Sequence, residues 1–163
     1  MSNGKTNNVF ISHHHKDDEH VDGLTSLLAR NGYNIRNSSI RAKPANQERL
    51  EKGLIKDAVI KRLLRIKISW AGTVIVLVGK ETHARPWVDW EIREANRQGK
   101  RIVGVYERGM KEKVDIPHSL ELYATSLVGW DSASIMNAID GKPAFQNPDG
   151  STCARMDGKH SVC

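Results

Sequence analysis

Two groups of polar residues lie directly beside apolar segments, and they are where this sequence offers chemistry. The first is Glu91, which follows Trp87 by four residues and Val88 by three. On a helix, residues three and four apart share a face, so the Glu91 side chain borders the apolar stripe. A carboxylate in that position is partly removed from water, which makes its charge useful to a bound ligand. The alternative is a solvated glutamate that pairs with a side chain one turn away.

The second group is a run of three histidines, His13–His15, which follows the apolar segment Val9–Ser12. With Asp17 or Asp18 as a further ligand they could hold a metal ion, but adjacent residues rarely converge on one ion and no cysteine is near. We therefore expect no metal and interpret the histidines as polar groups of a turn.

Motifs for phosphate binding and for nucleophilic catalysis do not occur in the sequence. Neither GxGxxG nor GxxxxGKS/T is present, so Gly79, Gly104 and Gly109 are interpreted as turn or packing glycines. No Ser-His-Asp or Cys-His arrangement can be argued from the spacing.

The apolar pattern predicts five short strands that alternate with helices. Thr73–Val78 is apolar without alternation, as in a strand buried on both faces of a sheet. Since crossovers between parallel strands run over a face of the sheet, we expect an α/β fold with one parallel sheet covered on both faces. Ligands bind such sheets at the carboxyl ends of the strands, so the loops after the first four strands should line the site. The other expected strands are Val9–Ser12, Tyr33–Arg36, Ile102–Tyr106 and Ser126–Trp130.

Helical spacing of apolar residues predicts the helices between these strands. In the helix Trp87–Gln98 the expected core stripe is Val88, Ile92 and Ala95. A long helix, Gln47–Lys67, carries one broad apolar stripe. The members of that stripe are Leu50, Leu54, Ala58, Leu63 and Ile66. The remaining helices are expected over residues 17–30, Ser119–Tyr123 and Ser132–Ile139.

The chain length of 163 residues fits one domain, which we place at residues 1–141. Residues 142–163 are rich in Gly, Pro, Asp and Ser and show no periodicity. We interpret them as a loosely attached or disordered C-terminal extension, with packing against the domain left open.

The net charge of +6 and the pI near 9.4 suit either nucleic acid or a phosphorylated small molecule. One basic cluster stands on the predicted long helix and consists of Lys61, Arg62, Arg65 and Lys67. Aromatic residues do not alternate with these charges as a stacking platform requires, which argues against nucleic acid.

Cysteine usage and hydropathy predict a soluble, cytoplasmic protein. Cys153 and Cys163 both lie in the C-terminal extension and cannot cross-link the core, as suits a reducing compartment. The polar first residues do not read as a signal peptide. The longest nearly uncharged run, Ile68–Gly79, is too short to span a membrane.

Three features in this order resemble the TIR (Toll/interleukin-1 receptor) family. The sequence Val-Phe-Ile-Ser at positions 9–12 opens the first strand, serines follow the second strand, and Trp-Val-Asp-Trp-Glu-Ile at positions 87–92 follows the third. More narrowly, the chain is similar to small bacterial TIR-like proteins of anti-phage signalling, including the Thoeris type, from about Val9 to about Ile139. The resemblance implies a flavodoxin-like three-layer sandwich with a five-stranded parallel sheet, in agreement with the strand pattern above.

The resemblance also implies roles for individual residues. The glutamate of the family's Trp-Val-x-x-Glu-Ile motif, the catalytic acid of NAD-cleaving members, is Glu91 here. Ser38 and Ser39 stand where the family's mobile loop after the second strand begins. The residues implied to contact the nucleotide are Phe10, Ser12, His13, His14, His15, Ser38, Ser39 and Trp87. The three histidines and the Ser-Ser-Ile loop differ from animal TIR domains. This difference affects the implied contacts with the nucleotide more than the implied reaction.

A single glutamate suits the implied reaction. Cleavage of NAD+ at its nicotinamide ribose passes through an oxocarbenium-like sugar cation. The leaving nicotinamide starts as a positively charged ring, so no general acid is needed, and one carboxylate that stabilises the cation or orients a ribose hydroxyl suffices. Trp87 or Trp90 could offer an aromatic face to the cationic ring, worth about 0.5–2 kcal/mol, with simple packing as the alternative.

The leading hypothesis is therefore an NAD+ glycohydrolase or cyclase that makes an ADP-ribose-derived signal in antiviral defence, with NAD+ as substrate and no cofactor. Its expected partners are a separate effector protein that senses the product and further copies of the chain, with no membrane. The alternatives are a non-catalytic TIR-type interaction module and a nucleotide or nucleic-acid sensor that uses the basic helix Gln47–Lys67.

Overall fold

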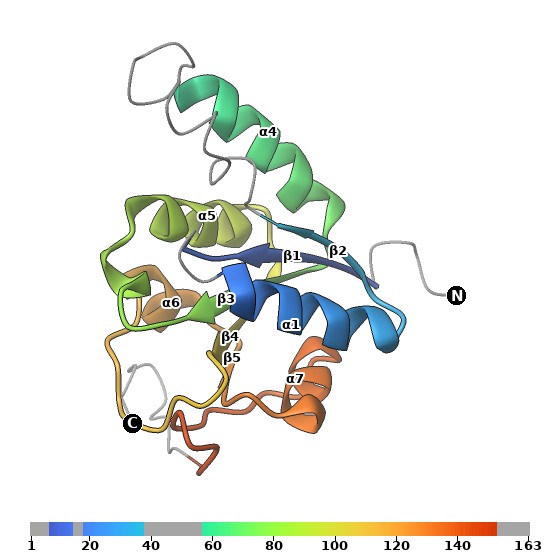
Figure 1. Ribbon diagram of the computed structural model, residues 1–163. Coiled ribbons are helices and arrows are strands. Elements are labelled where there is room, and N and C mark those ends of the chain that lie inside the picture. The colour runs from blue at the N-terminus through green and yellow to red at the C-terminus, as the bar shows by residue number, and fades with distance from the viewer. Residues whose placement is uncertain (1–6, 15–17, 38–56, 153–163) are drawn as a thin grey trace.

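The computed structural model describes residues 7–14, 18–37 and 57–152. Its centre is one sheet of five parallel strands in the order β2-β1-β3-β4-β5 (Figure 1). The strands are β1 (Asn8–Ser12), β2 (Asn34–Asn37), β3 (Thr73–Val78), β4 (Arg101–Tyr106) and β5 (Ser126–Val128). All four pairings are parallel, which confirms the predicted α/β fold.

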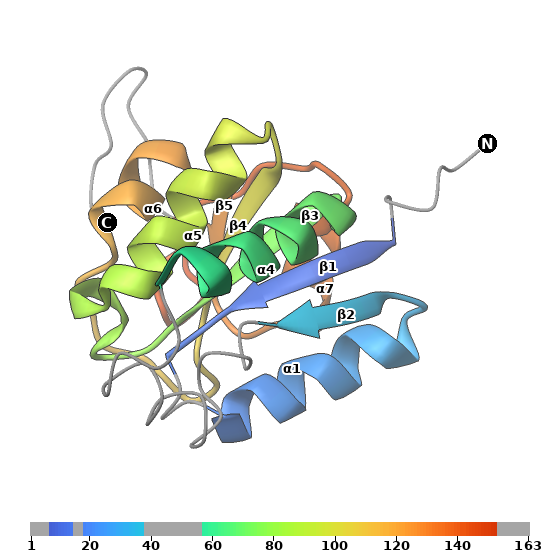
Figure 2. The ribbon, with the colours of Figure 1, turned by 90° about the horizontal axis from the view of Figure 1, so that it is seen from above.

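Helices cover both faces of this sheet. The helices α4 (Asp57–Trp70), α5 (Pro86–Arg97) and α6 (His118–Tyr123) pack on one face, and α1 (Asp18–Arg30) and α7 (Ser132–Ile139) pack on the other. Figure 2 shows α4, α5 and α6 following one another across their face, where α5 contacts both neighbours. A short 3-10 helix, η2 (Thr82–Ala84), joins β3 to α5.

The strands contribute side chains to two separate core layers, because successive side chains point to opposite faces of the sheet. Phe10 of β1 packs under α4 and α5, while its neighbours Val9 and Ile11 pack under α1 and α7. Every residue of β3 is buried, as expected for the central strand of a sheet with two covered faces.

The apolar stripe predicted for the long helix is wrong in its phase. Ala58 is exposed, and Leu63 and Ile66 keep 38% and 56% of their surface in contact with solvent. The side chains that α4 buries stand four residues apart and are Ile60, Leu64 and Ile68. The helix carries apolar residues over more than one face, so periodicity alone did not decide which face meets the sheet. Leu50, Leu54 and the predicted start at Gln47 lie outside the described residues.

The described part of the C-terminal extension packs against the domain. The N–H of Leu127 donates to Ala144 O at 2.9 Å, and the N–H of Gln146 donates to Leu127 O at 2.7 Å, so this segment lies beside the edge strand β5. Ala144 and Phe145 pack against the two core layers. As far as Thr152, hydrogen bonding to an otherwise open sheet edge replaces the loose attachment expected from composition. Residues 153–163, with both cysteines, lie outside the described part.

Within the described ranges, no helix combines the length and the apolar composition that a bilayer span requires.

Candidate active site

Glu91 is completely buried on α5 and points toward the carboxyl end of β1. The helix begins at Pro86, and its apolar stripe packs into the core as predicted, with Val88, Ile92 and Ala95 buried. Glu91 itself has 0% of its surface exposed. Its Oε1 accepts a hydrogen bond of 2.6 Å from the hydroxyl of Ser12, the last residue of β1, which is also fully buried.

The burial of this carboxylate excludes the interpretation of Glu91 as a solvated helix residue. Removing a charge from water is expensive unless hydrogen bonds and opposite charges compensate for it. An apolar residue at this position would extend the core at no such cost. Acidic side chains kept in such surroundings are enriched at functional sites.

The turn after β1 lies beside the loop after β3. His13 and His14 are 1% and 3% exposed, so both side chains are enclosed. His13 Nδ1 lies 3.1 Å from the carbonyl oxygen of His14, and His14 Nε2 lies 3.6 Å from Glu81 Oε2. Arg85 donates to the same Glu81 oxygen at 3.0 Å. The carboxyl ends of β1 and β3 are thereby tied together next to Ser12.

The loop after β3 is held in one conformation by its own hydrogen bonds. The N–H of Gly79 donates to Thr82 Oγ1 at 2.8 Å, and this hydroxyl is fully buried. A side chain at Gly79 would overlap the carboxylate of Glu107, and one at Gly104 would overlap Leu127, so both are packing glycines. Gly109 has a φ of 84° and forms a turn. These three glycines therefore play the roles predicted for them.

The two tryptophans of α5 are packed together. Their ring centroids are 6.1 Å apart with planes at 73°, an edge-to-face contact. Cations already cover the Trp90 ring, with Arg65 at 5.4 Å and Lys61 at 5.8 Å from its centroid. Trp90 is thus a packing residue that serves α4, and Trp87 remains as the aromatic candidate for ligand contact.

The structure brings together part of the predicted site. Ser12, His13, His14 and Glu91 are buried at the carboxyl end of β1. Phe10 is fully buried among apolar side chains under α4 and α5, so the structure places it in a core layer, and its contact with a nucleotide stays a prediction. Its ring belongs to the core because it stands two residues before the end of the strand. The remaining predicted residues, His15, Ser38 and Ser39, lie outside the described part of the chain.

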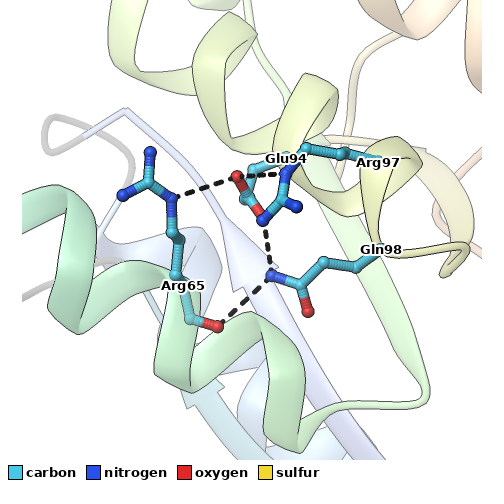
Figure 3. A network of polar contacts seen from close by, with 4 residues as sticks. All are labelled: Arg65, Glu94, Arg97 and Gln98. Carbon is cyan, nitrogen blue, oxygen red and sulfur yellow. Dashed lines mark hydrogen bonds and ion pairs between the residues drawn. The ribbon is translucent and has the colours of Figure 1, made fainter.

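A second buried acid on α5 was missed by the sequence analysis. Glu94 is 5% exposed and holds α4 to α5 through the network in Figure 3. Its Oε1 accepts from Arg65 Nε at 3.3 Å and Arg97 Nε at 3.1 Å, and its Oε2 accepts from Gln98 at 2.7 Å. Burial raises the pKa of Glu94, but the hydrogen bonds from Arg97, Gln98 and Arg65 outweigh it, so the net pKa lies below the ordinary value. Its position three residues after Glu91, on the same face, was the available signal.

Two other acids that reach the sheet edge were also missed. Glu107 is the first residue after β4, and Glu81 lies in the loop that follows β3. Ligand-binding side chains of parallel sheets come from these positions. That rule alone selects both residues. Among the described residues no three His, Cys, Asp or Glu side chains are grouped as metal ligands.

Comparison with known proteins shows the family to which this chain belongs. Residues 10–112 match the family model described as Thoeris protein ThsB, TIR-like domain. The chain belongs to this family. The matched range includes β1 from Phe10 onward, the turn after it and the whole of α5, and therefore Ser12 and Glu91.

Individual relatives are more distant. A protein of Bacillus cereus (strain MSX-D12) named "Putative cyclic ADP-D-ribose synthase ThsB1" is 32% identical over 57 residues. These cover 35% of this chain and only 30% of that relative. A solved structure of the CMP N-glycosidase BcmB of Clostridium botulinum covers 82% of this chain and 97% of its own, with 15% identity and a TM-score of 0.49. At that level the likeness adds nothing to the functional argument.

Proposed function

We propose that the chain cleaves the bond between nicotinamide and ribose in NAD+ and makes an ADP-ribose-derived signalling nucleotide. The observation that carries this proposal is the buried Glu91 carboxylate, held by Ser12 at the carboxyl end of β1. Membership of the ThsB TIR-like family supports it. The name of the Bacillus cereus relative, a cyclic ADP-ribose synthase, supports the product class.

In the proposed reaction the bond from the anomeric carbon to the nicotinamide nitrogen breaks, and its electron pair stays on the nitrogen. Nicotinamide leaves as a neutral molecule and the ribose becomes an oxocarbenium-like cation. Glu91 stabilises this cation electrostatically, in a site where low solvent content strengthens the interaction. Water then captures the cation and loses a proton, or a nucleophilic atom of the same nucleotide captures it and closes a ring.

The other residues of the site orient the reactants in this proposal. Ser12 fixes the Glu91 carboxylate by its 2.6 Å hydrogen bond. His13 and His14 line the turn beside it, and Trp87 offers an aromatic surface to the nicotinamide. We extend the proposal to Ser38 and Ser39, which follow Asn37, the last residue of β2, in the sequence.

The biological role proposed for the product is antiviral signalling. A product-sensing effector protein is the proposed partner, and the chain is proposed to act in the cytoplasm as an assembly of several copies. These statements rest on the ThsB family match, in which the TIR-like domain belongs to a Thoeris protein.

The experiment is to incubate the purified chain with NAD+ and follow nicotinamide release and the nucleotide product by mass spectrometry. Glu91→Gln keeps the shape and the acceptor for Ser12 but removes the charge, and should lower the rate by about 10²-fold or more. Asp22→Asn, which removes a carboxylate charge from an exposed residue of α1, is the matched control and should keep the wild-type rate. The measurement is repeated with infected-cell lysate, which supplies any trigger that turnover requires. Equal rates for the wild type and Glu91→Gln under both conditions would favour the non-catalytic interaction module.

A further inference from the structure

A pocket opens at the edge of the sheet that carries Ser12 and Glu91, beyond the carboxyl ends of β3 and β4. It has a volume of about 690 Å³ and is lined by Lys80 and by the segment Glu107–Val114. The segment is turned by Gly109, whose φ is 84°, and by a hydrogen bond of 3.1 Å from the N–H of Met110 to Glu107 O. The N–H of Glu107 donates to Val78 O at 3.0 Å, which fixes the start of the segment to the end of β3.

Unpaired cations dominate the lining of this pocket. They are Lys80, Arg108, Lys111 and Lys113. None of the four forms an ion pair or a side-chain hydrogen bond with another described residue. Of the two acids in the lining, Glu107 leans against Gly79 and reaches His20, with Oε2 3.5 Å from Nε2. The pocket therefore offers an excess of positive charge to a ligand.

Another basic hollow, in the described part of the chain, differs in this respect. It lies between α4 and α5 and includes Arg62, Arg65 and Arg97. Two of these three guanidinium groups are already bound to Glu94. Because their charge is neutralised within the fold, the sheet-edge pocket is the stronger site for an anion.

The pocket is continuous in the chain with the site of Glu91. Lys80 in its lining is followed by Glu81, and the Glu81 carboxylate contacts His14 in the turn after Ser12. A ligand that places one ribose at Glu91 can extend over this loop toward Lys80. In a dinucleotide the group that follows the nicotinamide ribose is the pyrophosphate, which carries the negative charge.

We propose that the pocket formed by Lys80 and Glu107–Val114 binds the pyrophosphate of the dinucleotide substrate and of its ADP-ribose product. The identity of the nucleotide rests on the proposed function, whereas the preference for a phosphate anion rests on the charges of the lining. Lysine ammonium groups bind phosphate as point charges on flexible stems, so the site needs no glycine-rich loop.

The test is calorimetric titration of the full chain with ADP-ribose and, separately, with inorganic pyrophosphate. Lys111→Glu places an acid in the pocket and should weaken binding of both probes by roughly tenfold or more, the effect of losing a charge-assisted hydrogen bond. Lys142→Glu is the matched control, since it makes the same change of net charge on an exposed residue after α7. Lys142→Glu should leave the affinity for each probe within about twofold of the wild-type value. The difference in affinity between the two variants should shrink as salt is added, because salt screens the charges.

Equal affinities of Lys111→Glu and Lys142→Glu for ADP-ribose would overturn the proposal, as would an absence of binding of either probe to the wild type. Both outcomes are separable from a failure of the enzyme proposal, because binding of ADP-ribose requires no turnover. A chain that binds both probes through Lys111 but releases no nicotinamide, either alone or with infected-cell lysate, would keep the pocket and contradict the proposed catalysis.

Discussion

Glu91 and Glu94 are two buried carboxylates three residues apart on the same helix, and they lie at different places in the fold. Glu94 accepts hydrogen bonds from two arginines and a glutamine and joins α5 to α4. Glu91 has the neutral hydroxyl of Ser12 against it, at the end of a strand where ligands bind. A carboxylate that binds cations from two helices holds the structure together, whereas one at the ligand-binding edge of the sheet is placed to act on a bound molecule.

The largest stability effect should come from the acid that joins the helices. Glu94→Gln removes the charge that Arg65 and Arg97 share, and we expect a loss of about 2 kcal/mol of unfolding free energy, limited by the exposure of both arginines. Urea denaturation measures it. Leu63→Ala on exposed α4 surface is the control and should cost far less. A Glu94→Gln protein as stable as the wild type would remove the distinction between the two acids.

Ser12→Ala should affect activity more than stability. Without its hydroxyl, the Glu91 carboxylate is no longer held in one orientation, and we expect kcat for nicotinamide release to fall by about tenfold while KM changes little. Steady-state kinetics give both values. An unchanged kcat would mean that the 2.6 Å hydrogen bond has no part in positioning Glu91.

Lowering the pH should reduce the contribution of the Glu94 network to the unfolding free energy. The pKa of Glu94 is lowered in the folded state, so its contribution is present above its ordinary pKa of 4.5 and is lost as pH falls below that value toward the folded pKa. The difference in unfolding free energy between the wild type and Glu94→Gln should therefore narrow between pH 6 and pH 3, as urea titrations at about these two values can show. A difference that stays constant would contradict the account.

The smallest stability effect should come from Glu91→Gln. An amide replaces a buried charge of the same shape and keeps an acceptor for Ser12, so the unfolding free energy should stay within about 0.5 kcal/mol of the wild type or rise. The same urea titrations measure it. A loss as large as that of Glu94→Gln would show that Glu91 serves the fold.

Features of the fold that depend on neighbouring residues were predicted from the sequence, and features that depend on distant parts of the chain were not. The helix Ser132–Ile139 and the buried stripe of α5 follow from periodicity and were predicted correctly. The buried face of α4 was not, because Leu63 and Leu64 are equally apolar and only the position of the sheet decides which one is buried. Composition likewise failed to predict that Ala144 and Gln146 pair with β5, since the open edge of a sheet is a property of the assembled fold.

In the candidate site, too, local features were predicted from the sequence and long-range contacts were not. Spacing placed Glu91 beside the apolar stripe, and the histidine turn after the first strand was expected at the same edge of the sheet. The covering of Trp90 by Arg65 and Lys61 involves a helix more than twenty residues away in sequence and could not be read from the motif. The contact of Glu81 with His14 also joins two loops that are distant in sequence.

The most direct measurement of the central claim is nicotinamide release from NAD+ by Glu91→Gln and Glu94→Gln side by side, below the temperature at which either unfolds. Loss of charge at Glu91 should lower the rate by about 10²-fold or more, whereas the same change at Glu94 should lower it by no more than about threefold. If the two variants lose activity equally, or if only Glu94→Gln loses it, Glu91 is not the acid that carries the reaction.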